Sequence, residues 1–343
     1  MRPNIIQIST GARLHFGFLA HAPESARQFG GVGLMVDQPG WKLRLQAAKG
    51  SADEIIATPR VREKLGEFLV RYRDPAADWS IPTPCRIEML EESPLHVGFG
   101  SGTQLGMAVA QGLSLLAGEN QISPEVLARR VSRGKRSALG MHGFHRGGLL
   151  VESGKTIADG VGTLVSRLDF PPTWRILLLR PQAKEGLSGT EEQKAFTRLE
   201  PMSIATTGDL CRVVLMELLP AVLNADFPAA SEALHEFGRR VGEYFAPIQG
   251  GLFSDPEMGE VYQFLRRSGV VGICQSSWGP TTAVICRDDD HAQEVIERLD
   301  SAGKTTLIKS VASPLNSGAA LEFPDMFTPS VEYDTEEADD VGQ

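Results

Sequence analysis

The sequence predicts an α+β fold in two domains. The chain has 343 residues, which is long enough for two domains with separate cores. Strand-like and helix-like segments follow one another without the regular alternation of a doubly wound sheet. The composition changes at Phe170-Pro171-Pro172-Thr173. We therefore expect one domain at 1–170, a second at 171–330, and an acidic tail at 331–343.

The first half contains four short strand patterns and three helical ones. The clearest strand has Trp41, Leu43 and Leu45 alternating with polar residues. A helix is expected to begin at Ser123-Pro124-Glu125, because serine caps a helix, proline suits its first turn and an acid favours its N-terminus. The predicted strands are 4–9, 41–45, 85–90 and 148–152, and the predicted helices are 60–72, 105–116 and 123–133.

The second half begins with a nearly continuous apolar strand, 174–179. Three helical patterns then follow, and they lead into three strands with one more helix before the last. The helices are expected at 206–223, 228–245, 256–268 and 291–301, and the strands at 270–274, 281–286 and 305–311.

A glycine-rich stretch, Pro94 to Gln104, is the most informative part of the sequence. Gly98, Gly100 and Gly102 alternate with other residues, Ser101 and Thr103 among them, between a predicted strand and a predicted helix. Glycines let backbone N–H groups approach a ligand, and a helix N-terminus favours negative charge. The stretch predicts a phosphate-binding loop. A turn that merely begins a core helix would have the same composition.

This loop is not one of the two commonest phosphate motifs. A P-loop ends in Lys-Ser/Thr, whereas Gln104 and Leu105 stand here, and the same two residues break the dinucleotide fingerprint. The stretch resembles instead the P-x-x-x-G-L-G-S-S-A motif of the GHMP superfamily, which includes galactokinase, homoserine kinase and mevalonate kinase. Pro94, Gly98, Gly100 and Ser101 match, whereas Phe99, Gly102 and Thr103 differ.

A second departure separates the chain from the kinases of that superfamily. The kinases carry S-G-x-D before a Gly-Gly pair, and here Ser137-Ala138-Leu139-Gly140 precedes Gly147-Gly148, so Gly140 replaces the catalytic Asp. With these departures, the sequence resembles the β-ribofuranosylaminobenzene 5′-phosphate synthase family, a GHMP branch that does not use ATP. Further matching blocks are Ala12–Gly17, Phe29–Leu34, Gly186–Glu192 and Gln275–Pro280, in family order.

The resemblance implies a fold, a reaction and a set of partners. The fold is a ribosomal protein S5 domain 2-like domain followed by a ferredoxin-like domain. The reaction is condensation of 4-aminobenzoate with phosphoribosyl pyrophosphate, a decarboxylating ribosyl transfer that releases CO2 and pyrophosphate and serves tetrahydromethanopterin biosynthesis in one-carbon metabolism. Mg²⁺ is expected to arrive with the pyrophosphate, without a dedicated protein site and without ATP. A homodimer is also implied.

Four residues are catalytic candidates: Arg13, His15, Arg136 and Ser137. Arg13 and His15 follow the first predicted strand, where an arginine could alternatively pair with a buried acid. Arg136 ends a basic run with Arg129, Arg130, Arg133 and Lys135 that would suit phosphate or carboxylate, although a solvated helix face explains Arg129 and Arg130 better. Ser137 belongs to the block that replaces the kinase motif.

The candidates for substrate or phosphate binding come from four segments. Arg27 could close over phosphate from the turn before Phe29, and His96 could orient substrate or be a structural histidine. Trp278 could stack on a flat aromatic acid or be a core residue. The full set is Arg27, His96, Gly98, Gly100, Ser101, Gly102, Thr103, Gln104, Lys184, Ser276, Ser277 and Trp278.

Composition narrows the class of protein. The net charge is −9, and without six acids in the tail it would be −3, so nucleic acid is not an expected partner. No apolar run approaches the roughly 18 residues of a membrane span, and a cytoplasmic protein is expected.

The four cysteines, Cys85, Cys211, Cys274 and Cys286, lack metal-site spacing and are expected to be reduced and buried. His142 and His145 lie among glycines that favour a loop, and no transition-metal site is predicted.

Two other classes of protein remain open from the sequence. A GHMP kinase that phosphorylates a small molecule with ATP would share the fold, although Gly140 and the Gly102-Thr103-Gln104 departure argue against it. A GHMP-fold protein that binds a ligand without catalysis is the other.

Overall fold

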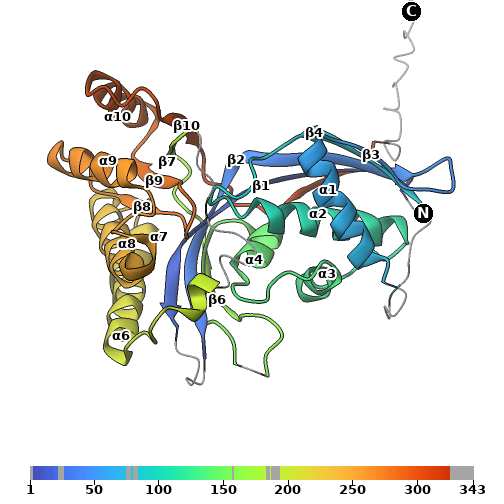
Figure 1. Ribbon diagram of the computed structural model, residues 1–343, viewed down its shortest axis with the longest axis horizontal. Helices are drawn as coiled ribbons and strands as arrows, with labels where there is room; N and C mark the ends of the chain where they lie inside the picture. Colours follow the sequence, from blue (N-terminus) through green and yellow to red (C-terminus); the bar gives the residue numbers. More distant parts are fainter. Residues whose placement is uncertain are drawn as a thin grey trace, which may run out of the picture.

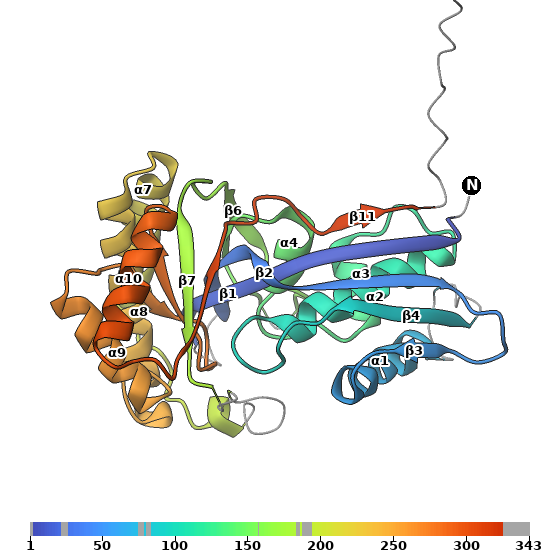
Figure 2. The same cartoon turned by 90° about the horizontal axis from the view of Figure 1, so that it is seen from above.

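The computed structural model describes residues 3–21, 27–74, 79, 84–156, 158–182, 186 and 194–324. They form two β-sheets, each covered by helices. Helices α1–α4 lie on one face of the first sheet, and α7–α10 gather at the opposite end of the molecule (Figures 1 and 2). The α+β fold expected from the sequence is confirmed.

The first sheet has the order β11-β1-β2-β4-β3, with β5 paired to β2 and β6 paired to β5. Its pairs are antiparallel except β3 with β4. Its strands are β1 (Ile5–Ala20), β2 (Phe29–Ala47), β3 (Glu54–Ile56), β4 (Cys85–Glu91), β5 (Leu149–Glu152), β6 (Leu164–Leu168) and β11 (Ala320–Glu322), and its helices are α1 (Pro59–Tyr72), α2 (Ser101–Leu116), α3 (Pro124–Arg130) and α4 (Leu139–Arg146).

The second sheet is antiparallel, with the order β10-β7-β9-β8. The helical pattern predicted at 206–223 is one continuous stretch whose middle, Val213–Leu218, is π-helical. The strands are β7 (Arg175–Arg180), β8 (Ile273–Gln275), β9 (Thr282–Cys286) and β10 (Ile308–Ala312), and the helices are α6 (Ile204–Arg212), α7 (Leu219–Leu223), α8 (Phe227–Gln249), α9 (Pro256–Arg267) and α10 (Asp289–Ser301).

One hydrophobic core runs through both halves. It contains Phe16 and Phe18 of β1 together with Phe237 of α8 and Trp278. Close approach between the halves is built in, because a Cβ placed on Gly17 would lie 2.5 Å from the Val241 methyl carbons of α8. The first strand and the second half therefore pack as one body, and residues of β1 are positioned by both.

Four features differ from the sequence-based expectations. The strand predicted at 4–9 continues as β1 to Ala20, so Arg13 and His15 lie within it. The loop expected around His142 and His145 is helix α4, whose Gly143 packs so tightly that a Cβ there would lie 2.4 Å from Met35 Sδ. Cys211 is exposed, whereas the other three cysteines are buried. Strand β11, from the second half of the sequence, belongs to the first sheet.

Candidate active site

The glycine loop, residues 98–103, ends in the first turn of α2. Gly98 and Gly100 have φ angles of 101° and 61°, a region that only glycine adopts easily. Gly100 directly precedes the helix, and among the described residues no side chain caps it. The first N–H groups of a helix have no partner within it and carry partial positive charge. This end of α2 is therefore suited to an anion.

Arg13 reaches the glycine loop from β1. Its backbone N–H donates to the Phe99 carbonyl at 2.9 Å. A Cβ placed on Gly100 would lie 2.9 Å from the Arg13 Nε, and one placed on Gly140 would lie 3.8 Å from the same atom. The guanidinium therefore lies between the start of α2 and the start of α4, in space that two glycines leave open.

His15 lies two residues after Arg13 on β1, and its side chain is buried. Neither of its ring nitrogens has a hydrogen-bond partner among the described residues. Burial lowers the pKa of His15 well below its usual value, and the charges of Arg13 and Arg136 lower it further. The imidazole is therefore neutral near pH 7 and lies within reach of the charges of Arg13 and Arg136. One of its ring nitrogens can donate a hydrogen bond and the other can accept one.

The serine turn, residues 276–279, holds both His15 and the glycine loop. The Ser276 hydroxyl accepts from the His15 N–H at 3.0 Å and donates to the Gly98 carbonyl at 2.6 Å. The Ser277 N–H donates to the His15 carbonyl at 2.7 Å. Gly279 meets Gly98 backbone to backbone, since a Cβ on Gly279 would lie 2.4 Å from the Gly98 Cα. Through these hydrogen bonds, Ser276 and Ser277 hold the backbone of His15, and Ser276 also holds that of Gly98.

Arg136 lies over an aromatic group. Its guanidinium carbon is 4.9 Å from the centroid of the Phe196 ring. The same ring stacks on Trp278, with centroids 4.6 Å apart, and the Trp278 side chain is only 4% exposed. Phe245 packs edge-on against Trp278. The indole thus belongs to the core, which is the packing alternative considered for this residue.

Glu152, at the end of β5, is a buried carboxyl that the sequence did not single out. It is 0% exposed and accepts from the Ala138 N–H at 2.7 Å, before the first turn of α4. Burial raises the pKa of Glu152, whereas hydrogen bonding to Ser137 and the positive charge of Arg13 lower it. Glu152 therefore supports the segment that carries Ser137 and faces the charge of Arg13.

Comparison with known proteins shows what the chain is similar to. Residues 218–305 match the model for the GHMP kinases C terminal domain. The β-ribofuranosylphenol 5′-phosphate synthase of Methanothermobacter thermautotrophicus is 29% identical over 293 residues, which cover 80% of this chain and 86% of that protein. The namesake from Archaeoglobus fulgidus is 28% identical, covering 82% and 88%. Over most of its length the chain is therefore similar to these synthases, and part of its second half matches the GHMP kinases C terminal model.

Solved structures of GHMP proteins share the fold. Homoserine kinase from Cytophaga hutchinsonii aligns with a TM-score of 0.62 at 14% identity, covering 93% of this chain and 98% of that one. Mevalonate pyrophosphate decarboxylase from Streptococcus pyogenes gives 0.63 at 11% identity, covering 92% and 98%. The two-domain GHMP-type architecture is therefore confirmed.

The residues that follow Gly100 differ in exposure: some side chains are buried and others are partly exposed. Gln104 is 0% exposed and entirely engaged, accepting from Thr10 Oγ1 at 2.6 Å and donating to the Gly140 carbonyl at 2.8 Å. Its role is to tie β1 to α4. Gly102 and Thr103 are partly exposed in the first turn of α2, and a Cβ on Gly102 would lie 3.3 Å from an Arg133 nitrogen. Ser101 is buried, and its carbonyl accepts from the Trp41 indole.

The other predicted residues lie in three different settings. Arg27 is half exposed and bonds to the Gly154 carbonyl at 3.0 Å, with Asp159 at 3.5 Å. His96 has a φ of 60°, and its carbonyl accepts from the Gly186 N–H at 2.6 Å. Lys184 and most of the Gly186–Glu192 block lie outside the described residues, as does the acidic tail at 331–343.

The basic run at 129–136 does not act as one unit. Arg130 is 6% exposed and donates to Ser114 and Tyr72 at 2.7 and 3.0 Å, and it pairs with Glu119. It is thus a core residue, neither a phosphate ligand nor part of a solvated face. Arg136 is the member of the run whose charge reaches His15.

No group of three or more His, Cys, Asp or Glu side chains that could hold a metal occurs among the described residues. His142 uses its Nε2 on the Gly162 carbonyl at 2.9 Å. Within the described part of the chain, none of the helices has the length and apolar character that crossing a bilayer requires.

Proposed function

We propose that this protein joins an aromatic acid to phosphoribosyl pyrophosphate, giving a β-ribofuranosyl arene 5′-phosphate, CO2 and pyrophosphate. The observation that supports it is Arg13 at the N-terminus of α2, with the neutral His15 on the same strand and the charge of Arg136 acting on that histidine, and with Gly140 where a kinase has its carboxylate. Two cations and a helix N-terminus suit a leaving pyrophosphate, on which negative charge develops.

The proposed chemistry needs no net proton transfer. The ring carbon that bears the carboxylate forms a bond to ribose C1′, and the C1′–oxygen bond breaks with its electron pair going to pyrophosphate. The ring–carboxylate bond then breaks, its electron pair restores the aromatic ring, and CO2 leaves. A site without a catalytic Asp is compatible with this balance, whereas phosphorylation of an alcohol must remove a proton.

The proposed acceptor is 4-aminobenzoate, and 4-hydroxybenzoate is the close variant. The relatives' name specifies a ribofuranosylphenol, which is the product that a hydroxyl-bearing acid would give. Both acids have an electron-donating group para to the reacting carbon. The product would enter tetrahydromethanopterin synthesis, and Mg²⁺ would be carried by the pyrophosphate oxygens of the substrate.

Carboxyl-labelled acid tests the proposal. Purified protein with phosphoribosyl pyrophosphate, Mg²⁺ and either labelled acid should release one labelled CO2 per pyrophosphate. Comparing the two acids identifies the acceptor. Retention of all label with both acids would rule the reaction out, and formation of ADP from ATP with a small alcohol would establish the kinase alternative.

A further inference from the structure

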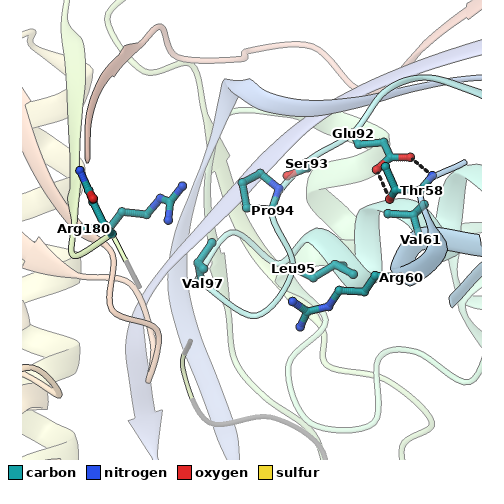
Figure 3. A pocket seen from close by; sticks show the side chains of 10 residues that line it. Thr58, Arg60, Val61, Glu92, Ser93, Pro94, Leu95, Val97 and Arg180 are labelled. Carbon is teal, nitrogen blue, oxygen red and sulfur yellow. Dashed lines mark hydrogen bonds between the residues drawn. The ribbon is translucent and has the colours of Figure 1, made fainter. Parts of the chain in front are cut away.

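A cleft of about 380 Å³ lies next to the glycine loop, between the two halves of the molecule. Four apolar residues form part of its wall: Val61 from the first turn of α1, and Pro94, Leu95 and Val97 just before the glycine loop. Figure 3 shows Arg60 and Arg180 extending their guanidinium groups toward these residues from opposite sides. None of the candidates from the sequence lines this cleft.

Arg180, the last residue of β7, carries one of the two guanidinium groups that line the cleft. Its guanidinium has no hydrogen bond or ion pair with any described residue, and partial burial, without a compensating carboxylate, lowers its pKa. A partly desolvated charge of this kind is stabilised when an anion binds beside it. The Arg180 end of the cleft is therefore suited to a carboxylate or phosphate.

A carboxylate stands at another side of the cleft. Glu92 accepts from the Thr58 N–H at 2.9 Å and from the Thr58 hydroxyl at 2.6 Å, which fixes its orientation at the start of α1. An ionised carboxylate can accept more than one hydrogen bond on each oxygen. Glu92 can therefore take a further donor from a ligand, whereas it would repel a phosphate.

We infer that this cleft, which we call the acceptor cleft, binds the flat aromatic acid of the proposed function. The acid's carboxylate would pair with Arg180, its ring would lie against the apolar wall, and its para amino or hydroxyl group would donate toward Glu92. The inference rests on the proposed function for the identity of the acid. It also replaces Trp278 as the aromatic platform, since that ring is covered by Phe196.

Substitution of Arg180 tests the assignment. Arg180→Gln should raise KM for the aromatic acid at least about tenfold, because a charge-assisted contact is lost, and leave KM for phosphoribosyl pyrophosphate within about threefold. Arg175→Gln is the matched control, since Arg175 lies on the same strand and pairs with Asp289. A raised KM for phosphoribosyl pyrophosphate alone, or no change in either KM, would overturn the inference.

A binding measurement separates this inference from the proposed reaction. Calorimetry with 4-hydroxybenzoate and with 4-aminobenzoate needs no turnover, and Arg180→Gln should weaken the affinity of at least one acid about tenfold. In the unmodified protein, bound ring protons should show nuclear Overhauser contacts to the Val61 and Val97 methyl groups. Absence of these contacts with saturating acid would remove the acid from the cleft. Binding without CO2 release would retain the cleft and reject the reaction.

Discussion

The Arg13 guanidinium lies against the bare α-carbon of Gly100, at the point where α2 begins. Any side chain at Gly100 would occupy the place of the Arg13 Nε, because the added Cβ would lie only 2.9 Å from it. The glycine loop and the arginine are therefore one unit, in which the loop leaves the space and the strand supplies the charge.

Gly100→Ala should lower kcat/KM at least about tenfold. The substitution pushes Arg13 away and places a side chain at a φ of 61°, which costs roughly 1–2 kcal/mol of stability. Steady-state kinetics and thermal unfolding measure the two effects. Gly160→Ala is the control, because an added Cβ there has no atom within 4 Å. Wild-type kinetics for Gly100→Ala would show that the close contact has no role in activity.

Arg136→Ala should lower kcat/KM roughly 10²-fold with little change in melting temperature, because a charge-assisted contact with an anionic substrate is lost. Arg136 lies over the Phe196 ring, and its charge acts on His15. Arg129→Ala, on the exposed side of α3, is the comparison and should be nearly silent. If both variants lose activity equally, the loss reports general surface charge and Arg136 has no specific role.

The pH dependence of stability should report the buried His15. Below about pH 6.5 the unfolded chain protonates this histidine and the folded protein does not, so unfolding takes up a proton and stability falls as the pH falls. Between that pH and the lower folded pKa, the unfolding free energy of the wild type should drop about 1.4 kcal/mol per pH unit more steeply than that of His15→Gln. Denaturant titrations at several pH values measure both slopes. Parallel slopes would mean that His15 is not kept neutral by burial.

Arg130→Met should act on stability and not on substrate binding. The substitution leaves Glu119 without its partner and removes the donor to Tyr72 and Ser114. Breaking a buried ion pair on one side costs about 3 kcal/mol, so the melting temperature should fall clearly while both KM values stay close to wild type. A raised KM for phosphoribosyl pyrophosphate, with an unchanged melting temperature, would instead indicate that Arg130 contacts this substrate.

The sequence located the glycine loop and the residues around it because glycine has a local signature. Gly98 and Gly100 take the positive φ angles that such a loop needs, and α2 begins at Ser101 directly after them. The N-cap of α3 at Ser123 could be predicted for the same reason, since capping depends on neighbours three residues away.

Long-range contacts could not be predicted in this way. The sequence places Gln104 among the candidates for substrate or phosphate binding. In the structure its side chain bonds to Thr10 and to the Gly140 carbonyl, contacts that require the folded sheet and helix. Glu152 ends an apolar strand right after a Gly-Gly pair, a position that could have drawn attention to a buried acid. The low helix propensity of glycine predicts a loop around His142 and His145. A helix forms there because tight tertiary packing, here of Gly143 against Met35, outweighs that weak preference.

The bonds from the serine turn also have a consequence for the order of events during synthesis. A nascent chain that has emerged only through its first half already contains the whole glycine loop. Two of the groups that fix its shape, Ser276 on the Gly98 carbonyl and Thr281 on the Val97 carbonyl, leave the ribosome 178 and 184 residues after the residues that they bind. The loop therefore gains its final form only after the second half has been made and has docked.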